Sequence, residues 1–233
     1  MRRLRGALLL LALAVGPPAL GASFFDTVGD NFDGNAHMDI TSVDVSSDAT
    51  NITFKINVNA ASITSPADWG KYCVGIDTGA GTGDPTVPKG NGWGRNIAMA
   101  DKMDAWIGSW VDSGGGFQPW TYSGGSWTQN GQGVPVLAGN STTITTTLAS
   151  LGLSAGQSFK FDVYTTGGGG EDSANDSLAN PSQSISDWPG PYMTPAAGQP
   201  GGALSYTAVP EPATLSLLGL VGLALAGVAR RRS

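Results

Sequence analysis

Six aromatic side chains crowd one segment of the chain and could bind a sugar. They are Trp93, Trp106, Trp110, Trp120, Tyr122 and Trp127. In an extended strand, Trp106 and Trp110 project from the same face. An indole ring can stack on the apolar face of a pyranose while neighbouring amides and carboxylates bind the hydroxyls. Large aromatics also pack in cores and across strands, so the spacing alone leaves a packing role open.

Aspartates gather near the N-terminal end of the predicted domain and could hold a calcium ion. The candidates are Asp26, Asp30, Asp33 and Asp39. Calcium takes oxygen ligands, and residues 30–35 resemble a fragment of a calcium loop without its alternating ligands and distal Glu. A second oxygen-rich patch comprises Glu171, Asp172, Asn175 and Asp176. Aspartate also favours turns by bonding its own backbone, which is the alternative interpretation of both groups.

Side chains for other catalytic chemistry are scarce. Residues 23–208 contain one Glu, one His (His37) and one Cys (Cys73), and no G-x-S-x-G motif. One Cys cannot form an internal disulfide, and one His cannot build a multi-histidine zinc site. We therefore expect no enzymatic activity, with a glycan-cleaving enzyme that uses a pair of aspartates as the remaining alternative.

A period of two residues predicts the strands that must position these side chains. Residues 52–58 alternate apolar and polar side chains, the pattern of a strand with one buried face. Shorter runs predict further strands at 40–45, 71–77, 92–100, 104–111, 142–148, 157–165 and 203–208. Residues 120–128 predict a hairpin in which the Gly124-Gly125 turn places Tyr122 opposite Trp127.

These strands predict an all-β fold, an antiparallel β-sandwich of the jelly-roll kind formed by one domain at 23–208. The 35 Gly residues suit tight turns, and the 13% share of charged residues argues against long surface helices. Residues 167–202 are expected to form a long loop anchored by Trp188, Tyr192 and Met193.

The N-terminal end of the sequence predicts a secretory signal peptide at 1–22. It has a basic head, a short apolar run and a small-residue cleavage site, with cleavage expected after Gly21 or Ala22. The protein is therefore expected to be exported through an inner membrane.

The C-terminal end, 209–233, predicts a membrane anchor with a recognition motif before it. An apolar stretch at 213–229 is long enough for one transmembrane helix, and basic residues after it would stay cytoplasmic, leaving the domain outside. The motif residues on both sides are Val209, Pro210, Glu211, Pro212, Arg230, Arg231 and Arg232.

This tail resembles the PEP-CTERM sorting tail of exported bacterial proteins. The likeness rests on Pro210-Glu211-Pro212, the Gly- and Leu-rich apolar stretch and the final Arg run. In that family the tail is handled by exosortase, a membrane enzyme of Gram-negative bacteria that make exopolysaccharide. The resemblance implies a protein that is anchored in the membrane at first and later lies at the cell surface or outside it.

Residues 26–208 resemble the sandwich domains of the family 9 carbohydrate-binding and DOMON-like group. The likeness rests on Gly29-Asp30, the stretch 71–78, the hairpin at 122–127 and Leu151-Gly152-Leu153. It implies sugar recognition, although other members of this group bind haem or serve as structural modules. We therefore expect a cell-surface or matrix protein associated with exopolysaccharide and able to bind carbohydrate, with a purely structural protein as the alternative.

The charge of the exported region excludes nucleic acid as a partner. Six of the 12 basic residues lie in the two end segments, whereas Glu211 is the only one of the 18 acidic residues that does. The remaining 17 acidic and six basic residues give residues 23–208 a formal charge of −11. Such a surface repels the phosphate backbone.

Overall fold

The computed structural model describes residues 20–63 and 69–209. This part of the chain is all-β with antiparallel sheets, as predicted, and adds two 3-10 turns, η1 (Ala36–Met38) and η2 (Ala149–Leu151). The predicted signal peptide up to residue 19, and the predicted tail and transmembrane helix from residue 210, lie outside the described residues. Within the described ranges, no helix is long and apolar enough to cross a membrane.

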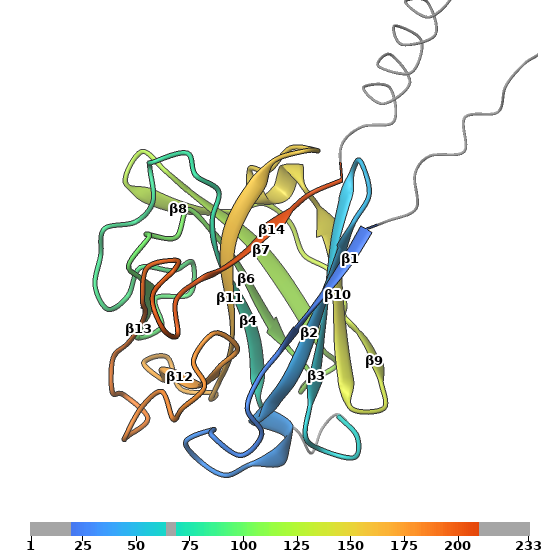
Figure 1. Cartoon of the computed structure of the whole chain (residues 1–233), viewed down its shortest axis with the longest axis vertical. Helices are drawn as coiled ribbons and strands as arrows, with labels where there is room; N and C mark the ends of the chain where they lie inside the picture. Colours follow the sequence, from blue (N-terminus) through green and yellow to red (C-terminus); the bar gives the residue numbers. More distant parts are fainter. Residues whose placement is uncertain (1–19, 64–68, 210–233) are drawn as a thin grey trace, which may run out of the picture. The chain divides into compact units, whose positions relative to one another are not determined.

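Two sheets share one core (Figure 1). The first has the order β1-β2-β3-β10-β9, with the bounds Leu20–Phe25, Ile40–Ser47, Asn51–Val58, Ser141–Thr147 and Val136–Ala138. The second has the order β12-β11-β4-β6-β7-β8, with the bounds Ala174–Ser177, Ser158–Thr166, Lys71–Asp77, Ala105–Trp110, Gly116–Ser123 and Ser126–Gln129. β14 (Leu204–Thr207) also pairs with β11. Apart from both sheets, β5 (Ile97–Met99) and β13 (Tyr192–Thr194) form a parallel pair.

Local sequence explains the clearest strand and turn. In β3 every second side chain from Ile52 to Val58 is buried, so the alternation predicted there is confirmed. The predicted hairpin forms between β7 and β8 with Tyr122 opposite Trp127. Gly124 and Gly125 have φ angles of +60° and +86°, a conformation that residues with a Cβ rarely adopt.

The central strands of the second sheet, β4, β6 and β11, are buried on both faces, which their sequence pattern does not reveal. On β4, Val74 joins the core between the sheets, whereas its neighbour Cys73 points to the opposite face. On β6, Ile107 and Trp106 divide in the same way. Segments around β5 and β13 cover the outer face and form a second apolar cluster there. This layer uses four of the six aromatic residues that the sequence offers as sugar ligands, Trp93, Trp106, Trp120 and Trp127.

Some predicted elements are wrong in extent. The strand expected at 92–100 is reduced to β5, and the loop expected at 167–202 contains β12 and β13. β1 and β9 were not predicted. β1 starts at Leu20, so cleavage after Gly21 or Ala22 would shorten this strand.

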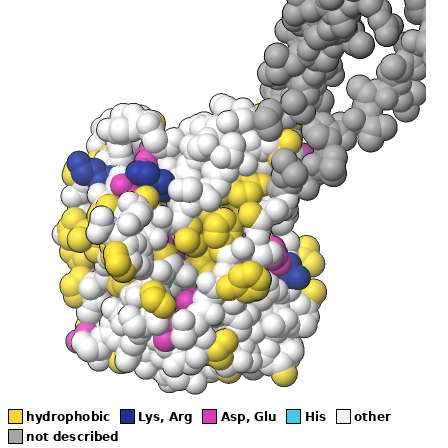
Figure 2. All heavy atoms as spheres, in the orientation of Figure 1, with side chains coloured by type: hydrophobic (Ala, Val, Ile, Leu, Met, Phe, Trp, Pro, Cys, Tyr) yellow, Lys and Arg dark blue, Asp and Glu magenta, His cyan; other side chains and the backbone are white. Residues whose placement is uncertain are grey.

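The space between β1 and β11 is closed by aromatic contact. The rings of Phe24 and Phe161 lie 5.0 Å apart in an edge-on arrangement. Figure 2 shows hydrophobic side chains gathered near the middle of this face, with the charged side chains scattered around them. The two sheets therefore meet through apolar side chains even where no strand joins them.

Candidate functional site

Three carboxylates from distant parts of the chain converge beside the loop that follows β1. Asp26 and Asp30 belong to this loop, and Asp176 belongs to β12. One carboxylate oxygen from each lies within 4.8 Å of the other two. We call these three residues the carboxylate cluster.

Backbone contacts hold the loop against β12. The Phe32 N–H donates to the carbonyl oxygen of Asn175 at 2.8 Å, and the Asp33 N–H donates to the Asn175 side-chain oxygen at 3.0 Å. Asn175 is fully buried. The strand and the loop thus present their carboxylates to one another in a fixed arrangement.

Three of the six carboxylate oxygens of the cluster have no hydrogen-bond donor. Asp176 is 1% exposed and accepts from the backbone N–H groups of Ile40, at 2.6 Å, and Ser177, at 2.8 Å. By contrast, Asp26 Oδ2 and both carboxylate oxygens of Asp30 are buried atoms without a partner. Buried oxygens of this kind cost free energy unless a proton or a cation satisfies them.

The same burial disfavours the ionised form of these carboxyl groups when no cation is bound. Burial, reinforced by the nearby Asp176 carboxylate, raises the pKa of Asp26 to about 9. Burial likewise raises the pKa of Asp176 to about 8, and it raises the pKa of Asp30. At neutral pH the cluster therefore holds either protons or a cation.

The structure brings together only part of the predicted calcium set. Asp26 and Asp30 are in the cluster, but Asp39 accepts from the Gly29 N–H at 3.0 Å and from Asn59 Nδ2 at 2.9 Å. Asp33 accepts from the side chain of Asn31 and the N–H of Asn35. These two residues shape the loop. The third member of the cluster, Asp176, was not in the predicted calcium set and comes from the second oxygen-rich patch.

Trp106, a predicted sugar ligand, is fully buried. Its ring stacks on Tyr164, with centroids 6.1 Å apart and an angle of 22° between the planes. It offers no face to a ligand in this structure.

Four other predicted aromatics are half-buried. Trp93 lies against Gly108 and donates from Nε1 to Gln118 at 3.1 Å. Trp110 contacts Trp93, with ring centroids 6.2 Å apart. Two more rings belong to the outer layer, where Trp120 packs on Gly92 and Trp127 Nε1 donates to Asp84 at 2.7 Å.

Tyr122 is the predicted aromatic that lines a pocket. The pocket has a volume of about 340 Å³, and hydroxyl and amide side chains share its wall, among them Thr82, Ser123 and Asn130. The Tyr122 ring is held by Trp127, whose centroid lies 5.5 Å away. An aromatic ring among hydroxyls and amides suits one sugar unit.

A second aromatic group was missed by the sequence reasoning because its members are far apart in the chain. Trp188 contacts Trp69 at 5.9 Å and Phe32 at 5.6 Å between ring centroids, and Trp69 is 40% exposed. No local spacing signals this group.

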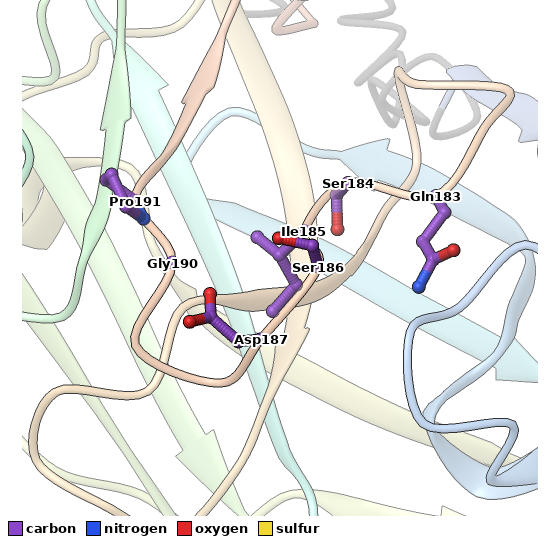
Figure 3. A pocket seen from close by; sticks show the side chains of 7 residues that line it. All are labelled: Gln183, Ser184, Ile185, Ser186, Asp187, Gly190 and Pro191. Carbon is purple, nitrogen blue, oxygen red and sulfur yellow. The ribbon is translucent and has the colours of Figure 1, made fainter.

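The largest of the described pockets offers little chemistry. It has a volume of about 700 Å³, and Figure 3 shows that its lining side chains come from one loop, between β12 and β13. Asp187 is its only ionisable lining residue among Gln183, Ser184, Ile185, Ser186, Asp187, Gly190 and Pro191. A single carboxylate does not make a catalytic pair.

Comparison with known families identifies the C-terminal tail. The PEP-CTERM protein-sorting motif matches residues 208–233, which include Pro210, Glu211 and Pro212. Searches of curated proteins and of solved structures gave no match. The chain therefore carries a PEP-CTERM protein-sorting motif, which implies an exported, surface-directed protein that exosortase sorts.

Proposed function

We propose that this is a non-enzymatic cell-surface or extracellular-matrix protein whose β-sandwich binds one calcium ion and associates with exopolysaccharide. The observation that carries the calcium part is the set of three buried oxygens without a partner, on Asp26 and Asp30, beside Asp176. The polysaccharide part rests on the sorting tail and on Tyr122.

The spacing of the carboxylates allows one calcium ion to contact all three residues. Oxygens bound to one calcium ion at about 2.4 Å lie at most about 4.8 Å apart, twice that distance. The oxygens of the carboxylate cluster lie within 4.8 Å of one another. Magnesium needs shorter bonds in a strict octahedron, whereas calcium accepts irregular oxygen sets completed by carbonyls and water.

The calcium site is tested by thermal unfolding of the protein recovered from its host and stripped with EDTA. We expect excess calcium to raise the melting temperature by roughly 5–10 °C, because an ion that binds only the folded state stabilises it. Asp30→Asn should lose this response, and Asp33→Asn should keep it, since Asp33 lies outside the carboxylate cluster. An unchanged melting temperature of the wild type would refute the site.

Polysaccharide binding is tested by native electrophoresis in gels that contain the producer's own polysaccharide. We expect the wild type to be retarded and Tyr122→Ala to migrate as it does without polysaccharide. Phe25→Ala is the matched control, because Phe25 is 79% exposed on β1 and does not line the Tyr122 pocket. Unretarded wild type would favour the alternative, a purely structural protein without a sugar ligand.

The structural alternative has its own support, because Trp106 is core and three other predicted aromatics are half-buried in the outer layer. Absence of catalysis is part of the proposal in either case. Incubation with the same polysaccharide should release no reducing ends, and their appearance would favour a glycan-cleaving enzyme.

A further inference from the structure

The last described residues belong to the folded domain. β14 is hydrogen-bonded to β11, and the next two residues, Ala208 and Val209, continue this docking. The Ala208 N–H donates to the Gln157 carbonyl at 2.9 Å, and the Val209 N–H donates to Ser47 Oγ at 2.9 Å. Ala208 and Val209 are 0% and 4% exposed. The chain is therefore still packed into the domain at Val209.

Ser47 links the two ends of the domain. In the β1–β2 pairing it lies opposite Leu20, at the start of β1. Its hydroxyl also lies 3.2 Å from the Tyr206 hydroxyl of β14, in addition to its bond with Val209. Both ends of the described chain therefore lie beside Ser47.

The sorting motif begins inside this docked segment. The matched residues start at 208, so Ala208 and Val209 are part of the motif and of the core at once. From Val209 to Ala213, where the apolar stretch is expected to begin, an extended chain spans at most about 14 Å. An enzyme that acts on the motif at the membrane must work within this short reach while the domain stays closed.

We propose that exosortase processes a form of this protein in which β14 and residues 208–209 have detached from the fold. The inference rests on the exosortase sorting that the motif implies. β14 is a short strand that pairs with β11 alone, the kind of element that opens locally at lower free energy than the whole domain. Detachment lengthens the accessible chain on the domain side of Pro210.

A disulfide that locks β14 tests this proposal in the full-length chain. Ser158 and Thr207 are directly paired, with their hydroxyl oxygens 2.7 Å apart, so a cysteine pair there suits disulfide geometry. Cys73 is buried and does not compete. In the exporting host, we expect S158C/T207C to be processed roughly tenfold more slowly than the wild type, because local opening is blocked. The single variants S158C and T207C are the matched controls and should be processed normally.

Two further variants separate detachment from misfolding. A flexible eight-residue insert between Val209 and Pro210 should restore processing of the locked protein. S47A, which removes the acceptor of the Val209 N–H, should be processed faster than the wild type. The control is I107V, on β6 and separated from β14 by β4 and β11, which should leave the rate unchanged.

Each outcome of the experiment is decisive. Normal processing of the locked protein, with its disulfide confirmed by mass, would overturn the proposal. Faster processing of I107V, equal to that of S47A, would also overturn it by assigning the effect to global unfolding. If the wild type were unprocessed in a host with exosortase, the sorting assignment would fail instead.

Discussion

Asp162 is fully buried, and both of its carboxylate oxygens accept hydrogen bonds. Its Oδ1 accepts from the N–H groups of Val163 and Ala179, and its Oδ2 accepts from the hydroxyls of Ser177 and Thr194, both at 2.7 Å. These bonds join β11 to β13 and to the chain after β12. Burial outweighs the four bonds and raises the pKa of Asp162 to about 6.

This raised pKa predicts a pH-dependent contribution to stability. Between about pH 4 and pH 6 the folded state binds the Asp162 proton more tightly than the unfolded state, so the free energy of unfolding falls as pH rises. The stabilisation by this proton is complete below about pH 4 and is lost above about pH 6. The free energy of unfolding changes by roughly 1–3 kcal/mol over this range. Urea unfolding of the wild type and Asp162→Asn from pH 4 to 7 measures it. A difference between the two proteins that does not vary with pH would contradict this assignment.

At the scale of residues, the sequence predicts chemistry only where partners are close in the chain. Asp26 and Asp30 were identified because they share one loop. Asp176 completes the carboxylate cluster only after β12 folds against that loop, a long-range contact that no spacing encodes. Trp106 was wrongly predicted to be available to a ligand. A tryptophan on an alternating strand gives the same sequence pattern whether the outer face of the sheet is exposed to solvent or covered by another layer.

The main finding at the scale of elements is the layer that covers the outer face of the second sheet. β4, β6 and β11 contribute residues to both apolar clusters, so these strands are buried on both faces. The covering segments around β5 and β13 are rich in turns and lack a period. Sequence alternation therefore predicted most strands of the two sheets, but not β1, β9 or β12, and not the layer above the second sheet.

Gly108 of β6 shows how tightly this layer is packed. A Cβ at this position would overlap the Trp93 indole ring, which is itself fixed by its bond to Gln118. We expect Gly108→Ala to destabilise the domain by about 1–3 kcal/mol and to shift tryptophan fluorescence, because overpacking forces the ring to move. Gly168→Ala is the control, since nothing lies within 4 Å of its Cβ position. Equal urea midpoints for the two variants would show that the layer is looser than described.

At the scale of the whole molecule, the predicted signal peptide and the sorting motif flank a domain whose two ends lie beside Ser47. The intact mass of the protein recovered from its host tests both expected processing events. We expect a product that lacks Met1 and Ser233, because signal peptidase and exosortase act at opposite ends of the chain. A recovered protein that retains both terminal residues would contradict both assignments. The tail is the part of the function that its sequence alone identifies, because a sorting signal is recognised as a linear motif.

β1 begins opposite Ser47, beside which both ends of the domain lie, and ends directly before Asp26 of the carboxylate cluster. Six strand residues span about 20 Å, so the cluster lies a strand length away from the end of β1 that pairs with Ser47. With the proposed calcium ion bound there, the free energy of unfolding would rise with the calcium concentration around the domain and fall where chelating polymers deplete the ion.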